Sequence, residues 1–594
     1  MNNKETRICQ NCKKTFVIEP SDFTFYEKIK VPPPTWCPEC RMARRMMFRN
    51  ERSLYKRKCD ATGKDIISMY SPDKPFRVYE QKYWWSDNWD PLGWGRDFDW
   101  SKPFFEQFRK LMKEVPCNNL SVATNNINSD YVNWETDDKN CYLCFAGNFN
   151  ENVAYSTREL SCKDSFDLLF VDKLERCYEN VICQNSYNLF YSQHCDNCID
   201  SWFLYDCRNC QNIFGCTGLR NKQYHIFNKP YSKNEYYKKL NEFNLGSYEA
   251  ILKIKKEFDR FKLSYPRKFA NLNNTYEVTG DNVIHTKNSK FIFDGMKEIE
   301  NSKFVFWGLY GLKDSYDVLG AGATAELIYD SIASGMSGSR ILFSVVALGC
   351  HSVFYSINCH HSSHLFGCIG LRNKQYCILN KQYTKEEYER LVPKIIEHMN
   401  EMPYIDKKGR IYKYGEFFPP ELSPFAYNET IAQEYFPLTK KQALEQGYPW
   451  KEPEERNIQF SIPNSQLPDN IKDVKDDIVG QIIECAHQGK CNEQCTEVFK
   501  IIPQELQFYR KMNLPLPRLC PNCRHYQRLK QRNPLKLWKR KCMCGGSTST
   551  NGVYKNTVSH FHGKESCPNE FETTYSPDRP EIVYCEECYL REVV

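Results

Sequence analysis

Cysteines near both ends of the chain stand at spacings that suit metal coordination. Cys9 and Cys12 form a C-x-x-C pair, and Cys37 and Cys40 form a second pair 25 residues further along. Two thiolate pairs at such a separation can close a tetrahedral Zn²⁺ site, because zinc in proteins takes four sulfur or nitrogen ligands. The sequence therefore predicts a structural zinc site formed by Cys9, Cys12, Cys37 and Cys40.

A similar set of cysteines lies near the C-terminus. Its two pairs are Cys491 with Cys495 and Cys520 with Cys523. We expect these four residues to bind a second zinc ion. Cys485 and His487 lie just upstream, and either could replace one of the four ligands. Free thiols without metal are the remaining alternative at both ends.

The two ends are copies of one module. Both have F-x-I-x-P, then FY, a proline-rich stretch, CPxCR, a run of basic residues, RN and KRKC. Further along, SPDKPFRVY (71–79) matches SPDRPEIVY (576–584). A match of this length at corresponding positions indicates an internal duplication.

Each copy also suggests its local fold. The proline of CPxC suits the first turn of a helix, where no N–H partner is needed, so the arginine-rich run behind it is expected to be that helix. The first part of each copy resembles the small zinc-binding domains of treble-clef and zinc-ribbon type, over about 40 residues. The resemblance implies a zinc-stabilised β-hairpin followed by a helix, and it implies no particular reaction.

The C-terminal copy has further candidate ligands. We expect a second zinc site there from Cys542, Cys544, Cys585 and Cys588, with His560, His562 and Cys567 as possible alternative ligands. The N-terminal copy keeps only Cys59 and has Glu80 and Tyr83 in place of the last pair, so no second zinc is expected there. The prediction is about three zinc ions per chain.

Basic residues gather in both modules. Residues 1–58 hold 14 Lys and Arg against 6 Asp and Glu, and residues 485–594 hold 17 against 11. The arginines that follow CPxC recur at helical spacing and are Arg41, Arg45, Arg49 and Arg52 in one copy and Arg524, Arg528 and Arg532 in the other. Such a face can bind phosphates through bidentate hydrogen bonds. The alternative is a solvated face that offsets the charge of the zinc thiolates.

The middle of the chain is repetitive. Residues 140–216 and 288–368 show short β-prone runs with a period close to 12, which is typical of a β-solenoid. We expect two parallel, right-handed-type solenoid lobes, residues 118–265 and 275–402, with helices after Ser232 and Thr384 as end caps. Most cysteines here are read as buried packing residues. The period leaves open whether one coil has 12 or 24 residues.

Three other segments complete the organisation. Residues 1–117 combine the first module with a tryptophan-rich stretch (83–108), read as a plug that docks the module onto the solenoid, with base or sugar stacking as the alternative. Residues 403–480 are read as a proline-rich linker, and 481–594 as the second module. Cys350, His351, Cys359, His360, His361 and His364 form a cluster read mainly as ladder packing, with a metal site as the alternative; four zinc ions per chain would favour that alternative.

Composition limits the function. The N-terminus has no apolar segment of the signal-peptide kind and the apolar stretch 341–349 is too short to span a bilayer, so we expect a cytoplasmic protein without a membrane partner. The first hypothesis is a non-enzymatic, zinc-dependent protein that binds RNA or a ribonucleoprotein through its arginine helices. The second is a scaffold that binds proteins or itself, and the remote third is a polysaccharide-active β-helix enzyme.

Overall fold

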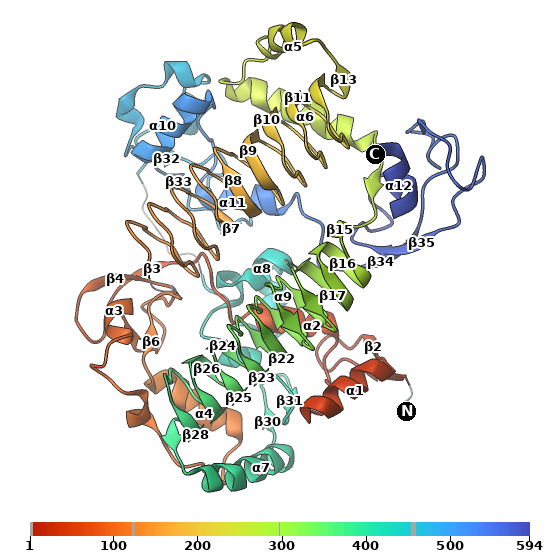
Figure 1. The fold of residues 1–594 in the computed structure, drawn as a ribbon. Coiled ribbons are helices and arrows are strands. Elements are labelled where there is room, and N and C mark those ends of the chain that lie inside the picture. Colours follow the sequence, from red (N-terminus) through yellow and green to blue (C-terminus); the bar gives the residue numbers. More distant parts are fainter. Residues whose placement is uncertain (1–3, 122–124, 296, 453–458, 594) are drawn as a thin grey trace. The chain divides into compact units, whose positions relative to one another are not determined.

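The computed structural model describes residues 4–121, 125–295, 297–452 and 459–593. The protein is mainly β, and its chain forms two compact units (Figure 1). Unit 1 combines residues 1–121 with 270–452 and a short piece, 535–537; unit 2 combines 122–269 with 453–534 and 538–594. Each unit therefore joins one repetitive segment to the cysteine module from the opposite end of the chain. This pairing cuts across the consecutive domains expected from the sequence.

Unit 2 contains the first ladder, residues 127–228. Its paired residues lie 12 positions apart and pair in parallel, as in Ile127 with Lys139 and Lys139 with Glu151. One turn of the ladder is therefore 12 residues, not 24. Its strands are β7 (Thr157–Leu160), β8 (Leu169–Glu175), β9 (Gln184–Phe190), β10 (Ile199–Trp202), β11 (Gln211–Phe214), β12 (Gln223–Ile226) and the antiparallel β13 (Lys229–Pro230).

Every third residue of the first ladder turns a corner. From Asn125 to Asn212 each third residue has a positive φ, close to +50°, and this left-handed conformation costs an ordinary L-residue about 1–2 kcal/mol. Asn and Asp tolerate it best, and they form a row in which the side-chain amides of Asn140 and Asn152 donate to the next residue of the row, Asn152 and Asp164, at 3.0 and 2.7 Å. Corners at this interval give each 12-residue turn four short sides.

The interior of the first ladder is filled by cysteine, serine and aliphatic side chains. Buried cysteines such as Cys177 and Cys198 pack with Leu189 and Leu204 in one core, as the sequence analysis predicted. Their thiols donate to backbone carbonyls. The serines also accept hydrogen bonds from the backbone. Ser186 Oγ, for example, accepts from the inward-facing amide of Cys198 at 3.0 Å. Buried amides need such partners, so small polar side chains recur every turn.

Unit 1 contains the second ladder, residues 272–382. Its turns are 11 or 12 residues long at first, as in Leu272 with Val283, then 13, as in Lys290 with Lys303, and 12 again later, as in Ser339 with His351. Strands β17, β19, β21, β22, β20 and β18 pair in a closed ring of six parallel strands. The first strands are β15 (Leu272–Asn273), β16 (Tyr276–Ile284), β17 (Thr286–Gly295), β18 (Ile299–Glu300), β19 (Lys303–Phe306), β20 (Leu312–Lys313), β21 (Tyr316–Leu319) and β22 (Ala325–Ile332). The later ones are β23 (Ser339–Leu342), β24 (Val345–Leu348), β25 (His351–Phe354), β26 (Ile357–His360), β27 (Ser363–Phe366), β28 (Gln375–Ile378) and β29 (Lys381–Gln382).

Helices follow both ladders, as predicted. Ser232 and Thr384 form capping boxes with the glutamates three residues later, which satisfy the first free amides of each helix. The helices are α5 (Lys233–Leu240) and α6 (Tyr248–Leu263) after the first ladder and α7 (Lys385–Glu401) after the second. Within each unit, α5 lies against β12 and α7 against β28.

The tryptophan-rich segment packs on the last turns of the second ladder, within unit 1. Trp84 is fully buried, its ring edge meets His360, and the guanidinium of Arg372 lies 5.3 Å from its ring centre. The amide of Arg96 donates to Leu379 O, on the final turn. These contacts agree with the docking interpretation of this segment. Its elements are α3 (Gln81–Trp84), η1 (Pro91–Trp94), α4 (Phe104–Glu114) and β6 (Cys117–Asn118).

The linker prediction is wrong for residues 403–452. Phe417 and Phe418 are fully buried and Tyr427 and Ile431 nearly so, which places this stretch in the core of unit 1. Proline content misled the prediction, because prolines that break strands and helices do not prevent burial of the aromatics between them. The elements are β30 (Tyr404–Ile405), β31 (Ile411–Tyr412), η2 (Pro420–Leu422), η3 (Tyr427–Glu429), α8 (Ile431–Tyr435) and α9 (Lys440–Glu445), with η4 (Asn464–Gln466), η5 (Ile471–Asp473) and η6 (Asp476–Ile478) in unit 2.

The two cysteine modules have matching elements. The N-terminal cysteine module, residues 5–79, contains β1 (Glu5–Ile8), β2 (Thr15–Ile18), α1 (Pro20–Ile29), α2 (Pro38–Met46), β3 (Tyr55–Lys58), β4 (Asp65–Ser68) and β5 (Val78–Tyr79). The C-terminal cysteine module, residues 483–534 and 538–593, contains β32 (Ile483–Glu484), β33 (Val498–Phe499), α10 (Pro503–Met512), α11 (Pro521–Leu529), β34 (Trp538–Lys541), β35 (Glu570–Thr573), β36 (Val583–Tyr584) and α12 (Glu586–Val593). The short β14 (Arg267–Lys268) pairs with β36. As expected, the arginine-rich runs form helices with proline at the first turn.

Candidate metal centres

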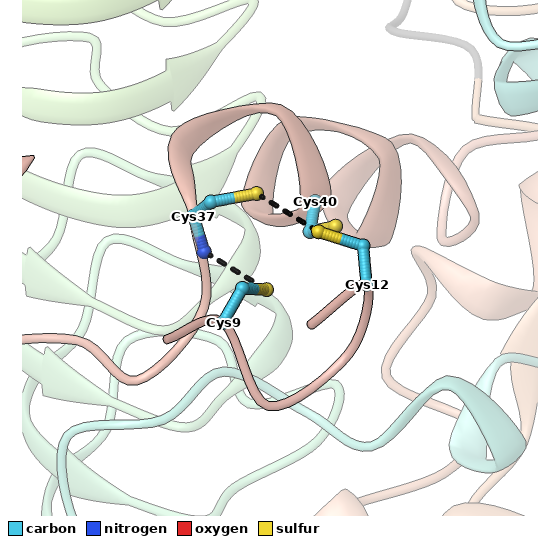
Figure 2. Close-up of side chains that lie close together, drawn as sticks. All are labelled: Cys9, Cys12, Cys37 and Cys40. Carbon is cyan, nitrogen blue, oxygen red and sulfur yellow. Dashed lines mark hydrogen bonds between the residues drawn. The ribbon is translucent and has the colours of Figure 1, made fainter. Parts of the chain in front are cut away.

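Four cysteines of the N-terminal cysteine module converge on one point (Figure 2). Cys9 follows β1, Cys12 lies in the next turn, Cys37 is the N-cap of α2 and Cys40 lies in its first turn. Their ligand atoms lie within 4.8 Å of one another, and Cys12 Sγ is 3.8 Å from Cys37 Sγ. Sulfurs at the corners of a tetrahedron around zinc would be about 3.8 Å apart, given Zn–S bonds of about 2.3 Å. The predicted set is therefore placed together.

Two of the four sulfurs accept hydrogen bonds from N–H groups. The amide of Cys37 donates to Cys9 Sγ at 3.2 Å, and Asn11 Nδ2 donates to Cys40 Sγ at 3.4 Å. Hydrogen bonds from Cys37 and Cys40 hold the pKa of the Cys9 thiol far below its ordinary value. The thiolate is the form that binds metal. Cys9 is therefore held as a thiolate, whereas the same hydrogen bonding raises the pKa of Cys40, and that of Cys37 to about 12.

The first group of the C-terminal cysteine module corrects one predicted ligand. It consists of Cys485, Cys495, Cys520 and Cys523, so Cys485, named only as an alternative, stands where Cys491 was expected. The amide of Cys520 donates to Cys485 Sγ at 3.2 Å, as that of Cys37 does to Cys9. Cys485 is thus the counterpart of Cys9. Residues inserted between Cys485 and Cys495 carry Cys491, whose sulfur lies 3.7 Å from Cys523 at the edge of the group, beside His487 and Glu493.

The second group of the C-terminal cysteine module also corrects one predicted ligand. Cys542, Cys567, Cys585 and Cys588 converge, all buried, so Cys567 takes the place expected for Cys544. Cys544 lies instead in an adjoining group with His560 and His562, and this group also includes Cys588. A hydrogen bond from Cys542 lowers the pKa of Cys585 to about 4.

The N-terminal cysteine module has different side chains at the matching positions. Cys59 follows β3 as Cys542 follows β34, and the amide of Glu80 donates to Cys59 Sγ at 3.3 Å, as that of Cys585 does to Cys542. The other two positions hold Thr62 and Tyr83. Of Cys59, Thr62, Glu80 and Tyr83, only Cys59 carries a thiol. These four side chains therefore do not form a four-thiolate group like that of the C-terminal cysteine module.

The histidines of the second ladder have separate partners. His351 Nδ1 meets Ser339 Oγ at 3.0 Å, His360 packs its ring against Trp85 at 4.7 Å, and His364 stacks on Tyr376 at 4.9 Å. Cys350 and Cys359 are buried inside the ladder and donate to backbone carbonyls. Burial lowers the pKa of His360 to about 3. This arrangement favours the packing interpretation of the cluster.

The arginine helix of the N-terminal cysteine module is buried against the second ladder. Arg41 pairs with Asp317 at 2.8 Å, and Arg45 bridges Asp317 and Asp330 at 3.1 and 2.7 Å. Arg44, which the sequence analysis did not single out, pairs with Asp330 and with Glu416. All three arginines are at most 1% exposed. Each guanidinium is therefore neutralised within unit 1.

Helix α11 of the C-terminal cysteine module is buried against the first ladder in the same way. Arg524 and Arg528 bind the two oxygens of Asp167 at 2.7 and 2.6 Å. Arg528 also donates to Tyr155 O, and Arg524 lies 3.4 Å from Glu505. Asp167 is fully buried.

One docking pattern serves both units. The module contributes FY from one helix and the arginine of CPxCR from the next, and the ladder contributes Ser-Phe-Asp (165–167) or Ser-Tyr-Asp (315–317). Phe25 stacks on Tyr316 with ring centres 3.9 Å apart, and Phe508 meets Phe166 at 4.5 Å. The aspartates turn outward at left-handed corners, with φ of 57° at Asp167 and 56° at Asp317. The repeated S-[FY]-D triplet was the signal in the sequence that could have revealed these partners.

The arginine face assigned to phosphates is therefore an internal interface. Arg49 pairs with Glu51 at 2.6 Å and is buried, and Arg52 is 8% exposed. Arg532 is half-buried, and its guanidinium lies 4.0 Å from the ring centre of Phe170. Carboxylates and aromatic rings cover most of these side chains. The expectation of a solvent-accessible helix face is therefore wrong for Arg41, Arg45, Arg49, Arg52, Arg524 and Arg528, whereas Arg532 is half-buried.

None of the helices in the described ranges is both long and apolar enough to cross a membrane.

Comparison with known proteins identifies no relative of the chain. No protein-family model matches the chain, and no curated protein matches it significantly.

Proposed function

We propose that the chain is a non-enzymatic, zinc-dependent scaffold in which each of two β-solenoid lobes is held by one treble-clef zinc module. The observation that carries this proposal is the docking pattern shared by the two units. In both units, arginines of the module's basic helix form buried ion pairs with an aspartate of the ladder. Breaking such a buried pair costs about 3–5 kcal/mol, so the module and the ladder behave as one structural element.

Zinc is the metal that the four-cysteine groups fit best. Closed sets of four thiolates are typical of structural zinc, whereas catalytic sites keep an open position. The protein supplies amide hydrogen bonds to the sulfurs in each group, at 3.2 Å to Cys9, Cys485 and Cys542. Zinc bound there would fix the hairpin and the helix that present the FY and arginine side chains to the ladder.

A partner would meet a surface that the docking leaves open. A groove of about 710 Å³ lies in unit 2 between α10 and the polar corner row of the first ladder. Asn128, Asn140, Asn152 and Asp164 line one side. Gln504, Gln507 and Phe508 line the other. Amides that can donate and accept beside an aromatic ring suit an extended protein segment, so we favour a protein partner or a second copy of the chain over nucleic acid.

Buried carboxylates do not favour the polysaccharide-active alternative. Glu135, Asp138 and Glu159 lie inside the first ladder and are at most 1% exposed. Burial raises the pKa of Glu135 and Glu159 well above the ordinary range of a carboxyl group. A sugar chain outside the ladder would not reach them.

The proposal is tested by separating stability from nucleic-acid binding. Binding of the full-length protein to a fluorescent single-stranded RNA is measured by anisotropy at low and high salt, alongside thermal unfolding, for wild type, Arg41→Gln and Arg524→Gln. The scaffold proposal expects each substitution to lower the midpoint of unfolding by roughly 10 °C, from about 4 kcal/mol at about 2–4 °C per kcal/mol. The matched controls are Lys58→Gln and Lys541→Gln. Both lysines are exposed, so these substitutions should leave the midpoint of unfolding unchanged.

One result would contradict the scaffold. If RNA binds with a steep salt dependence, and Arg41→Gln and Arg524→Gln abolish binding without lowering the unfolding midpoint, then these arginines serve phosphates and the first hypothesis holds. Loss of stability without an effect on RNA binding supports the scaffold.

A further inference from the structure

Two candidate metal groups in the C-terminal cysteine module share one ligand. Cys542, Cys567, Cys585 and Cys588 form one group, and Cys544, His560, His562 and Cys588 form the other. Within each group all ligand atoms lie within 4.8 Å of one another. Cys588 lies in the first turns of α12, and its sulfur is 3.4 Å from His562 Nε2. Sulfur and nitrogen ligands of one zinc ion are about 3.6 Å apart, from Zn–S of about 2.3 Å and Zn–N of about 2.0–2.1 Å.

We propose that this module binds two zinc ions in one cluster, with the Cys588 thiolate bridging a four-cysteine site and a Cys544–His560–His562 site. The proposal rests on zinc binding as proposed above for the four-cysteine group. It adds a fourth ion to the chain, at a place different from the histidines of the second ladder.

The hydrogen bonds of the two histidines orient them as ligands. His560 Nε2 lies 2.9 Å from Glu592 Oε1, which accepts, so the proton sits on Nε2 and the lone pair on Nδ1. Among the described residues His560 Nδ1 has no hydrogen-bond partner, and the side chain is completely buried. A buried nitrogen without a partner is costly, and coordination of a metal ion would satisfy it.

His562 is oriented by the opposite nitrogen. Its Nδ1 lies 2.7 Å from the backbone oxygen of Glu565, an acceptor, so Nδ1 carries the proton and the Nε2 lone pair faces Cys588. A carboxylate or a carbonyl behind each imidazole is the usual outer support of zinc-binding histidines. Both histidines thus have the tautomer that coordination requires.

The remaining ligand, Cys544, has similar support. Asn556 Nδ2 donates to Cys544 Sγ at 3.2 Å, and Tyr584 donates to Asn556 Oδ1, which fixes the amide. Cys544 is fully buried. Glu592, which holds His560, also accepts from Tyr554 and Thr557, so it is anchored independently of any metal.

Charge favours occupation of the second site. Four thiolates on one zinc ion leave two formal negative charges, whereas five thiolates and two histidines on two zinc ions leave one. Excess charge is costly to bury, and all four sulfurs of the first group are buried. The second ion therefore lowers the charge of the cluster.

A third group in the same module lacks this support. His487, Cys491, Glu493 and Cys523 also lie close together. Glu493 is already paired with Lys530, and the imidazole of His487 faces Glu493 itself at 3.1 Å. The carboxylate that would be a ligand is already paired with a lysine, so we assign no metal there.

The test is the number of zinc ions in the full-length protein, measured by native mass spectrometry. We expect four ions in wild type, three in the double variant His560→Ala/His562→Ala, and two in Cys588→Ser. The matched control, His351→Ala/His364→Ala in the second ladder, should keep four. Three ions in wild type, or four in the His560→Ala/His562→Ala variant, would overturn the cluster. No zinc at all would instead overturn the proposed function.

A measurement on wild type avoids any variant that fails to fold. The protein is loaded with ¹¹³Cd, and its NMR spectrum is recorded. Four metal ions predict four resonances, three from all-sulfur sites and one from a mixed nitrogen and sulfur site. The shared thiolate predicts that the mixed resonance is coupled to one of the all-sulfur resonances through the Cys588 sulfur. A mixed resonance without coupling, or no mixed resonance, would overturn the bridge.

Discussion

The two units dock the same kind of module onto the same kind of ladder, but with different amounts of charge and metal. In unit 2 one aspartate, Asp167, takes both arginines of α11. In unit 1 the corresponding Asp317 is joined by Asp330 and Glu416, which match the additional arginine of α2. The N-terminal cysteine module has a single four-cysteine group, whereas its counterpart has two and an adjoining histidine group.

This comparison shows which features the docking requires. The FY pair, the arginine after CPxC and the S-[FY]-D triplet occur in both units, so they form the shared core of the interface. Among the described residues, a second four-cysteine group occurs only in the C-terminal copy. In the other copy the tryptophan-rich segment follows directly and packs on the second ladder through Trp84.

The largest expected effect comes from removing one metal ligand in each unit. Cys37→Ser and Cys520→Ser each remove the N-cap cysteine of an arginine helix. Structural zinc contributes about 10–16 kcal/mol in zinc-finger peptides, as much as the whole stability of a typical domain. We expect Cys37→Ser to unfold the N-terminal cysteine module and Cys520→Ser to unfold residues 483–534, because the groups around Cys588 remain. Hydrogen exchange with mass spectrometry measures both.

A control and an opposing outcome sharpen this experiment. Cys491→Ser removes a cysteine outside the four-cysteine group and should leave exchange unchanged. If Cys520→Ser also exposes the amides around Cys542 and Cys585, the C-terminal groups do not fold independently, and the difference between the two modules is smaller than we infer.

A smaller effect is expected from the aspartates of the ladders. Asp167→Asn removes the carboxylate that Arg528 pairs with and leaves Arg524 with Glu505 at 3.4 Å, and should cost about 5 kcal/mol. Asp317→Asn should cost less, about 3 kcal/mol, because Arg41 loses its partner at 2.8 Å whereas Arg45 keeps Asp330 at 2.7 Å. Urea unfolding of the full-length variants measures the difference. Equal losses would show that Asp330 does not compensate in unit 1.

The smallest effect is expected from the stacked rings. Phe25→Leu and Phe508→Leu remove contacts with Tyr316 and Phe166, and should each cost about 1 kcal/mol. Because the two ring pairs occupy the same place in the docking pattern, the losses should be similar. Phe149→Leu, at an exposed corner of the first ladder, is the control without a ring partner from a module. Thermal unfolding is the measurement, and a loss in only one unit would contradict a shared interface.

Local patterns in the sequence predicted local structure well. The cysteine spacing placed Cys9, Cys12, Cys37 and Cys40 together, and CPxC located the starts of α2 and α11. The period of 12 identified both ladders, although its inner period of three, with a small or apolar inward residue such as Ser186, Leu189 or Ser192 at each third place, went unnoticed. These features depend on residues within one turn or hairpin of each other, so spacing alone constrains them.

Ligand choice and partner choice depended on the tertiary structure. Cys485 and Cys491 are both close in sequence to Cys495, and only the path of the inserted residues decides that Cys485 reaches the group. The arginines after CPxC looked like a free basic face because their carboxylates are hundreds of residues away in the chain. The sequence by itself determined the modules, the repeats and the duplication. The structure decided that each module docks on the ladder distant from it in sequence, because burial of charge requires a partner in space and not along the chain.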